Sequence, residues 1–285
     1  MKLDCLVATI NMFDKNHNIF TALRNQSFKD FRIIIVHQGP TKFDFTLVEG
    51  LNYKYIHIDT LGLSAARNIG IKLSDSDFLS ILDDDAWVAE NYIQKLVDKF
   101  TTNTFSCICG LIIDPITNKP LARSIKKVPS FKMGAHNYNY FMSSAVTVTT
   151  NLAKSTFFDE LLGVGSIYGG SEEMDFFLRI VKNNDVIFDP DLIVYHPSDR
   201  DKMKKMSLFE IFKRGFLYGA GRGAVYKKHL NSRKIFYLFS FLKSICSILL
   251  ILILDLFLLN LHFFLRDIGS LSGRIFGFFT FPRRI

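Results

Sequence analysis

The sequence has 285 residues, of which 48% are hydrophobic, and its formal net charge at pH 7 is +8. This hydrophobic content excludes wholesale disorder, and the length allows one large domain with an appendage or two small domains. A positive balance is typical of proteins that meet an acidic partner, such as nucleic acid, a phosphorylated substrate or an anionic membrane. The four scattered cysteines are interpreted as core residues of a reduced, cytosolic protein.

The first two thirds of the sequence alternates segments typical of strands with segments typical of helices. Strands are expected at residues 3–10, 30–39, 53–59 and 77–85, and helices at 18–26, 63–74 and 90–100. This alternation predicts a parallel sheet with right-handed crossovers, in which ligands bind at the carboxyl ends of the strands. Asn11, the segment 37–39 and the segment 83–85 lie at such ends.

Three consecutive aspartates, Asp83, Asp84 and Asp85, follow an apolar run. Such a cluster is either a solvated turn or a site for a divalent cation, whose charge makes neighbouring carboxylates tolerable. Mg²⁺ or Mn²⁺ held by few carboxylates usually keeps substrate phosphates among its other ligands. The metal interpretation therefore predicts a phosphorylated substrate, with Arg67 and Asn68 near enough to contribute cationic or amide contacts.

The composition changes after Pro197. Residues 200–234 hold eleven Lys or Arg against two acidic residues, and an apolar run, Ser244–Leu265, follows. At about 1.5 Å per residue, this run matches a hydrocarbon core of roughly 30 Å. Basic residues flank it on both sides, so a single span would place one basic cluster on the wrong face. A single span, two in-plane helices (Ile235–Leu265 and Ile268–Phe281), and a helical hairpin buried in a homodimer all remain open.

Five segments occur in an order that resembles one enzyme family. The segment 7–36 contains a strand ending in T-x-N, a helix and a second strand, and Gly62–Gly70 reads G-L-S-A-A-R-N-I-G. Asp83–Asp85 forms a D-x-D motif, Gly170–Arg179 opens an acidic helix, and Val186–Pro197 closes the series. Their order and spacing resemble glycosyltransferase family 2, whose members are inverting enzymes of the GT-A fold, and in particular its bacterial surface-polysaccharide type.

The resemblance implies the fold class and the activity. It implies an α/β fold of GT-A type over residues 1–198, Rossmann-like, with a mostly parallel central sheet and helices on both faces. Residues 199–285 are expected to form basic amphipathic and apolar helices that associate with the membrane. The implied activity is metal-dependent hexosyl or deoxyhexosyl transfer from a nucleotide-sugar, UDP- or dTDP-linked, to a glycan or lipid-linked acceptor in cell-surface polysaccharide synthesis. The expected location is the cytoplasmic face of the bacterial inner membrane, with no nucleic-acid partner.

The resemblance also assigns roles to residues by position. Nucleotide-sugar binding is expected of Thr9, Asn11, Gln38, Arg67, Asn68, Asp83 and Asp84. A Mn²⁺ or Mg²⁺ ion is expected on Asp85, Asp83 and His196. Glu173 is expected to be the catalytic base, with Glu172 and Asp175 beside it. On the residues alone, the same acidic run is also typical of the first turn of any helix, where acids complement the helix dipole.

One departure from the family pattern leaves the function open to alternatives. His37 and Gln38 stand where the family usually has an aspartate pair that grips the nucleobase, although a Gln amide can still form paired hydrogen bonds to a pyrimidine. A catalytically inactive, membrane-bound sugar-nucleotide-binding protein is therefore one alternative. A metal-dependent phosphohydrolase using Asp83–Asp85 is the other, although the flanking residues lack the small side chains expected there.

Overall fold

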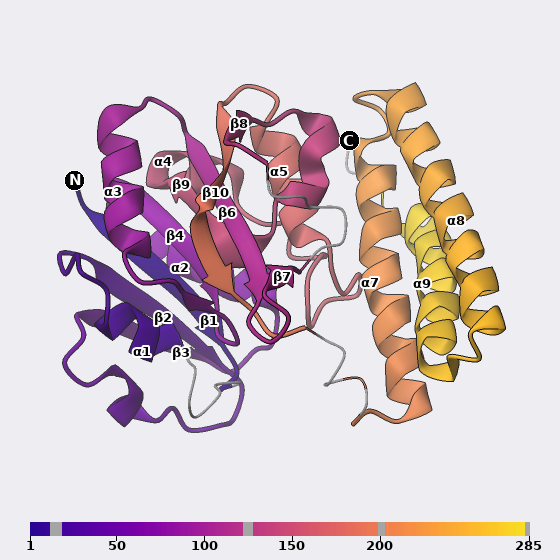
Figure 1. The fold of residues 1–285 in the computed structure, drawn as a ribbon, viewed down its shortest axis with the longest axis horizontal. Coiled ribbons are helices and arrows are strands. Elements are labelled where there is room, and N and C mark those ends of the chain that lie inside the picture. Colours follow the sequence, from indigo (N-terminus) through magenta and orange to yellow (C-terminus); the bar gives the residue numbers. More distant parts are fainter. Residues whose placement is uncertain (12–18, 122–127, 199–202, 204, 283–285) are drawn as a thin grey trace. The chain divides into compact units, whose positions relative to one another are not determined.

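The computed structural model describes residues 1–11, 19–121, 128–198, 203 and 205–282 (Figure 1). The chain divides into two compact units. The first unit comprises Met1–Phe158 and Glu173–Pro197, and the second comprises Asp159–Glu172 and Ser198–Ile285. The sequence did not predict that the segment Asp159–Glu172 belongs with the C-terminal helices.

The first unit is built on one sheet. Its strands are β1 (Leu3–Thr9), β2 (Arg32–Gln38), β3 (Tyr53–Ile58), β4 (Phe78–Asp83), β5 (Trp87–Val88), β6 (Cys107–Asp114), β7 (Lys119–Pro120), β8 (Phe131–Lys132), β9 (Val146–Thr149) and β10 (Val186–Tyr195). The main order is β3-β2-β1-β4-β9-β6-β10-β5, with β7 paired to β6 and β8 to β10. The strands β3, β2, β1 and β4 are parallel, as predicted, whereas β9 runs antiparallel to both β4 and β6. The sheet is therefore mixed in its second half.

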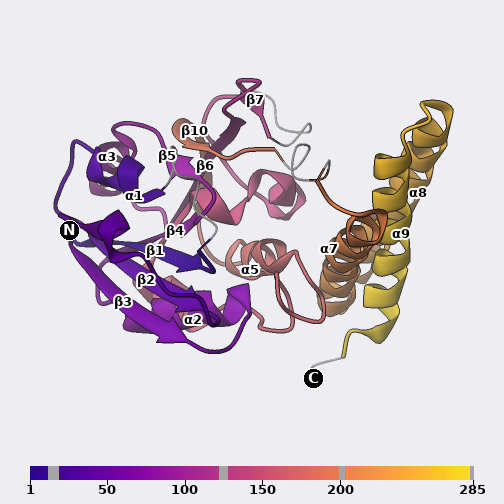
Figure 2. The ribbon, with the colours of Figure 1, turned by 90° about the horizontal axis from the view of Figure 1, so that it is seen from below.

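Helices cover both faces of this sheet, as predicted. They are α1 (Ile19–Arg24), α2 (Leu63–Leu73), α3 (Tyr92–Thr102), α4 (Thr150–Thr156) and α5 (Glu172–Ile180). Every residue of β1 is buried, and its side chains alternate between the faces. Cys5 and Val7 join the core formed with α1 and α3, whereas Leu6 meets Gly70 of α2 so closely that a Cβ there would collide with it. Figure 2 shows α1 and α3 across the sheet from α2.

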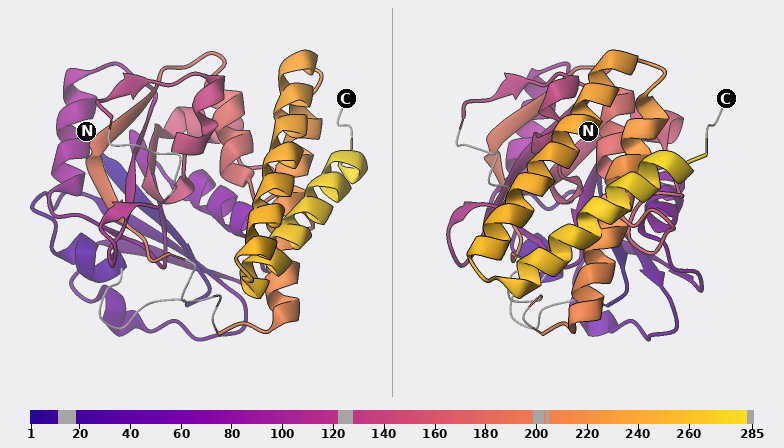
Figure 3. Two further views of the ribbon diagram at one scale, coloured as in Figure 1. Left: turned by 45° about the vertical axis from the view of Figure 1, so that its right-hand side comes forward. Right: turned by 90° about the vertical axis from the view of Figure 1, so that its right-hand side faces the viewer.

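Three long helices form most of the second unit: α7 (Leu208–His229), α8 (Lys234–Phe257) and α9 (Leu261–Thr280) (Figure 3). Ser207 and Glu210 cap the start of α7 reciprocally. The segment Asp159–Glu172 packs on α7, where the Lys228 ammonium lies 2.7 Å from the Asp159 carboxylate and Gly221 faces the backbone of Gly170.

The predicted apolar run Ser244–Leu265 is not one helix. The backbone turns at Leu258–Asn260, where Leu259 has a left-handed φ of +50° and the Asn260 amide donates to the Asp255 carbonyl at 3.0 Å. This pattern ends a helix in the same way as a C-terminal glycine does. The single span over those residues is therefore wrong. Among the described residues, Lys234–Phe257 is the helix long and apolar enough to cross a membrane.

Glycines hold α7 and α9 together. Gly215, Gly219 and Gly223 of α7 face the backbone carbonyls of Arg266, Ser270 and Arg274 of α9, and Gly269, Gly273 and Gly277 of α9 face the backbone of α7 in return. The contacts advance by four residues in both helices, so α7 and α9 run parallel. The helix α8, which lies between them in the sequence, runs in the opposite direction. An added Cβ at any of these glycines would collide with main-chain atoms. This is the small-residue packing by which helices reach close backbone contact.

Candidate active site

The candidate active site lies where the parallel strands of the first unit end. Asp83 is the last residue of β4, Asp85 follows two residues later, and His196 follows β10 directly. One ligand atom from each of these three residues lies within 4.8 Å of the others. The structure therefore brings together the three residues that the sequence analysis assigned to a metal.

Strand pairing places His196 beside Asp85. Tyr195 of β10 pairs with Trp87 of β5, and their rings stack with centroids 5.9 Å apart. The His196 Nε2 consequently lies 3.1 Å from Asp85 Oδ1, while its Nδ1 lies 2.7 Å from the Pro197 carbonyl oxygen. Burial alone would lower the pKa of His196, but the hydrogen bond and charge of Asp85, the charge of Asp83 and the Pro197 carbonyl outweigh it, raising the pKa to about 9.

Arg67 holds the carboxylate of Asp83 in place. The Arg67 Nη2 lies 2.6 Å from Asp83 Oδ1 and 3.0 Å from Ser143 Oγ, and the guanidinium lies over the Phe158 ring at 5.4 Å. Only 1% of Arg67 is exposed. The structure thus gives Arg67 a positioning contact with Asp83, and its contact with the nucleotide-sugar stays a prediction. Sequence reasoning missed Ser143, because nothing in its spacing connects it with Asp83.

The middle aspartate binds a different strand. Thr9 is the last residue of β1, and its Oγ1 donates to Asp84 Oδ2 at 2.6 Å. The parallel register explains this bond, since Ala8 pairs with Asp83 and the next residues therefore lie opposite each other. The backbone N–H of Asn11 in turn donates to Thr9 Oγ1 at 2.8 Å. The three consecutive aspartates consequently have three different partners, Arg67, Thr9 and His196, which offsets their mutual repulsion.

Asn11 presents an acceptor at this end of the sheet. Its backbone is left-handed, with φ of +69°, and its Nδ2 donates to Thr41 Oγ1 and to the Lys42 carbonyl at 2.9 and 2.8 Å. These bonds fix the orientation of the side chain. Its Oδ1 is buried and has no hydrogen-bond partner within the described part of the chain. A buried acceptor of this kind is suited to receive a donor from a ligand.

His37 and Gln38, the departure from the family pattern, are both buried at the end of β2. His37 bonds the Tyr55 hydroxyl at 2.9 Å, and burial, with a contribution from His57, lowers its pKa. Gln38 Oε1 accepts the Gly62 amide at 2.8 Å, just before α2. The predicted paired contact of Gln38 with a pyrimidine would use this same oxygen. In the structure that oxygen joins β2 to α2.

Two further predicted site residues act on the backbone after α4. Both polar groups of the Asn68 amide bind Phe158, at 3.0 Å to its carbonyl and 2.8 Å from its amide. Asp175 is fully buried and pairs with Arg179 at 2.9 Å, and Arg179 also donates to the Phe157 carbonyl at 2.6 Å. These bonds fix the segment whose Phe158 ring lies under Arg67. The ligand-binding role of Asn68 and the catalytic role of Asp175 stay predictions. Glu172 begins α5 and Glu173 follows it in the first turn.

Comparison with known proteins identifies the family. The model of glycosyl transferase family 2 matches residues 5–153, more than half of the chain. The Bacillus subtilis protein EpsH is 29% identical over 110 residues, which cover 37% of this chain and 32% of EpsH. The O-antigen chain rhamnosyltransferase RfbN of Salmonella typhimurium is 24% identical over 159 residues, covering 54% of this chain and 48% of RfbN. The chain thus aligns with a third to a half of these relatives.

Solved structures share the fold. The S. aureus TarS crystal structure superposes with a TM-score of 0.59 at 18% identity, covering 81% of this chain and 44% of that one. TarS 1–349 in complex with UDP-GlcNAc superposes with a TM-score of 0.56 at 17% identity, over 78% of this chain and 66% of that one. These likenesses confirm the GT-A fold expected from the sequence. With the family match over residues 5–153, they lead to one conclusion: the chain belongs to glycosyl transferase family 2.

Proposed function

We propose that the protein is an inverting glycosyltransferase that moves a sugar from a nucleotide-diphosphate donor to a glycan acceptor at a membrane surface. The observation that carries the proposal is the cluster of Asp83, Asp85 and His196 at the carboxyl ends of the strands. Family membership supports sugar transfer, and the naming of the relative RfbN as a rhamnosyltransferase supports a hexosyl or deoxyhexosyl group.

The residues of the cluster suit a divalent cation. Two carboxylates and one imidazole are ligands that Mn²⁺ accepts, and carboxylates suit Mg²⁺. Asp83 is also held from outside the cluster by Arg67, and the bond of Asp84 to Thr9 holds the loop that carries Asp85. A bound Mn²⁺ or Mg²⁺ would supply positive charge for the leaving nucleoside diphosphate. Arg67 and Thr9 would keep the carboxylates in place to hold such an ion.

The nucleotide would lie against the ends of β1 and β2. The buried Oδ1 of Asn11 is a hydrogen-bond acceptor, and the imide N–H of uracil or thymine is a donor that matches it. This match supports a UDP- or dTDP-sugar. The structure of TarS 1–349, which shares the fold, is a complex with UDP-GlcNAc and agrees with a uridine donor. Glu173, in the first turn of α5, is the proposed general base that takes the proton of the acceptor hydroxyl.

The second unit supports a membrane location. Only 17% of the most apolar window of α8 is buried, and Ile235, Phe239 and Phe257 are 86%, 66% and 80% exposed. Apolar side chains exposed along a whole helix are typical of a membrane or protein contact. The proposal places the protein at the cytoplasmic face of the bacterial inner membrane, with a lipid-linked acceptor.

Donor hydrolysis tests the proposal. The full chain is incubated with UDP- and dTDP-sugars, with manganese or with a chelator, and free nucleoside diphosphate and inorganic phosphate are measured. A transferase should release nucleoside diphosphate slowly, only with the metal, and Asp85→Asn should abolish this release. Release of inorganic phosphate would instead indicate a phosphohydrolase. Nucleotide-sugar binding without turnover, with any acceptor, would indicate an inactive binding protein.

A further inference from the structure

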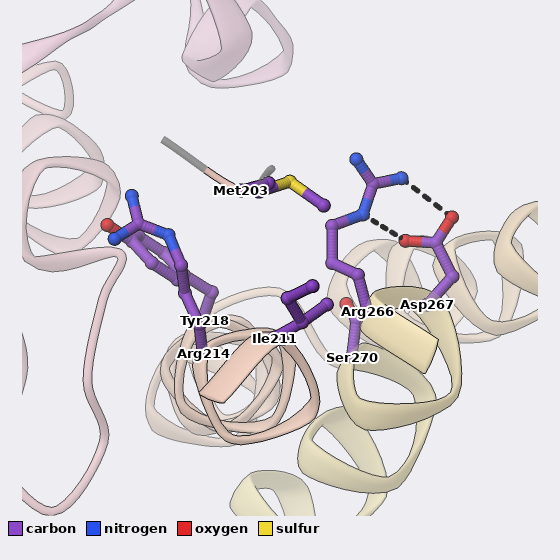
Figure 4. Close-up of a pocket in the computed structure, with 8 residues that line it drawn as sticks. Met203, Ile211, Arg214, Tyr218, Arg266, Asp267 and Ser270 are labelled. Atoms are coloured by element: carbon purple, nitrogen blue, oxygen red, sulfur yellow. Dashed lines mark hydrogen bonds and ion pairs between the residues drawn. The ribbon is translucent and has the colours of Figure 1, made fainter. Parts of the chain in front are cut away.

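A pocket of about 190 Å³ lies within the second unit, between α7 and α9 (Figure 4). Its walls combine two arginines with apolar and small residues. They are Met203, Ile211, Arg214, Gly215, Tyr218, Arg266, Asp267 and Ser270. Since a water molecule occupies roughly 30 Å³ in the liquid, the pocket has room for a group several times that size. Neither the catalytic proposal nor the family match uses these residues.

The pocket follows from the glycine contact between the helices. Gly215 lies against the carbonyl of Arg266, so the two backbones touch at the floor. Side chains next to that contact must then diverge to either side. Figure 4 shows Arg214 and Tyr218 of α7 on one side and Arg266 of α9 on the other, with Ile211 between them. The space between the two arginines is therefore a consequence of the fold.

The polar groups of the pocket suit a single anionic group. Asp267 accepts from both Nε and Nη2 of Arg266, at 2.6 and 2.7 Å, and only 4% of Asp267 is exposed. This pair uses two of the five guanidinium N–H donors and fixes the plane of the guanidinium. The Arg214 guanidinium lies over the Tyr218 ring at 5.0 Å, which orients it as well. Two arginines thus line the pocket, and the planar donors of a guanidinium match the oxygens of a phosphate ester.

The apolar part of the unit indicates where that phosphate comes from. The turn that leads into α9 exposes Leu258, Leu259 and Leu261 by 74%, 89% and 53%. Arg266 follows Leu261 by five residues of helix, which is about 7.5 Å along the axis. The exposed apolar side chains of this turn are therefore available to contact the acyl chains of a lipid whose phosphate lies near Arg266.

We infer that this pocket binds the phosphate of a membrane lipid, held between Arg214 and Arg266, with its apolar chain directed toward the exposed turn Leu258–Leu261. Arginine is well suited to phosphate because its planar donors match the phosphate oxygens. Met203 and Ile211, which are 6% and 1% exposed, give the pocket an apolar wall for the ester carbons. The inference rests on the proposed membrane location for the source of the phosphate, but it does not involve the sugar-transfer site.

Native mass spectrometry of the full chain in neutral detergent tests the inference, because it counts bound lipids without any donor or acceptor. The probes are phosphatidic acid, diacylglycerol with the same chains, and inorganic phosphate. The wild-type chain should retain one phosphatidic acid and no diacylglycerol. Arg214→Gln removes one arginine, and Ser270→Leu fills the pocket without a charge change. Each should weaken phosphatidic acid binding about tenfold, the first through loss of a charge-assisted hydrogen bond and the second through loss of the space that the phosphate needs.

The matched control is Lys213→Gln, which removes the same charge from an exposed neighbouring position that does not line the pocket. It should bind phosphatidic acid as the wild type does. An equal loss in Lys213→Gln would overturn the inference in favour of diffuse charge attraction. Unchanged binding in Arg214→Gln and Ser270→Leu would place the lipid elsewhere. Inorganic phosphate that binds as tightly as the lipid and displaces it would show a site for a soluble phosphate. Sugar transfer, assayed separately, is expected to survive each of these failures.

Discussion

The two units of this chain are stabilised by different kinds of contact. At the sheet end of the first unit, polar side chains from distant segments hold one another, as Arg67 holds Asp83 and Thr9 holds Asp84. In the second unit, α7 and α9 meet where side chains are missing, and main chain packs on main chain at residues such as Gly219. The first arrangement needs particular functional groups, whereas the second needs their absence. The contrast teaches that a conservative substitution means something different in each unit.

The largest effect is expected at the proposed base, where the function of the first unit depends on one carboxylate. Glu173→Gln keeps the size of the side chain but cannot accept a proton. Sugar transfer should fall by about 10²- to 10⁴-fold, the usual contribution of general base catalysis, while donor binding is retained. The exposed Glu90→Gln is the matched control and should transfer at the wild-type rate. Near wild-type transfer by Glu173→Gln would exclude it as the base.

The second unit should be most sensitive to substitutions that add a side chain at the glycines between α7 and α9. Gly219→Val would drive a side chain into the backbone of Ser270, which cannot move aside as a side chain can. Overpacking that side chains can relieve costs about 1–3 kcal/mol, so we expect a loss above ~3 kcal/mol here. Hydrogen exchange should show lost protection in α7 and α9. Lys213→Val, at an exposed site of the same helix, controls for the low helix propensity of valine and should preserve that protection.

A smaller effect is expected where a side chain acts through another. Arg67→Gln removes the group that orients Asp83, and loss of such a supporting contact commonly lowers metal affinity by about 10- to 100-fold. Titration with manganese measures this affinity directly. Ser143→Ala removes a second, neutral partner of Arg67 and should cost clearly less. An equal cost for both variants would mean that Arg67 needs Ser143 in order to hold Asp83.

The last effect is graded, because it depends on pH and is about tenfold for each pH unit. His196 has its pKa raised to about 9, so in metal-free protein its paired, protonated form stabilises the fold below about pH 6.5. That contribution is lost as the pH rises through about 9. Metal affinity should change in the opposite direction, because His196 must lose its proton to bind an ion. It should rise about tenfold per pH unit up to about pH 9 and then level off.

Thermal unfolding and manganese titration across this pH range check both trends. His196→Gln is the control, and it should flatten the pH dependence of metal affinity and of metal-free stability together. A metal affinity that rises equally steeply in His196→Gln would assign the proton to another group. A change of pH alters the charge of His196 without altering any side chain of the site. The substitutions above change charge and shape together.

Sequence reasoning predicted that the proposed metal ligands would lie together, because they follow the ends of strands. The alternation of strands and helices predicted that Asp83 and Asp85 would lie at a strand end, and the family resemblance added His196. Which carboxylate meets which partner depends on strand register, so the bond between Thr9 and Asp84 was not predictable. The roles of Asn68 and Asp175 were assigned from motif position alone. Their contacts with Phe158 and Arg179 depend on three-dimensional packing, which motif position does not predict.

In the second unit, sequence reasoning predicted the kind of helix but not where the helices end. Its composition predicted apolar, membrane-associating helices, but the helix end at Leu258–Asn260 falls inside an uninterrupted apolar run. No proline or glycine marks that turn in the sequence, so hydrophobicity alone concealed it. The glycines of α7 and α9 were visible at four-residue spacing. They indicate packing only once their partner helix is known, because a stripe of glycines does not specify what it faces.

The parallel glycine stripes also determine where the chain tolerates a change of length. Each residue of an α-helix advances about 100° around the axis, as 3.6 residues per turn require. A single inserted residue between Gly215 and Gly223 would therefore turn the later glycines a quarter of a turn or more away from Arg274 and its neighbours. An insertion at Leu258–Asn260 changes neither stripe. The chain can thus be expected to accept extra residues at this turn and to reject them within α7 or α9.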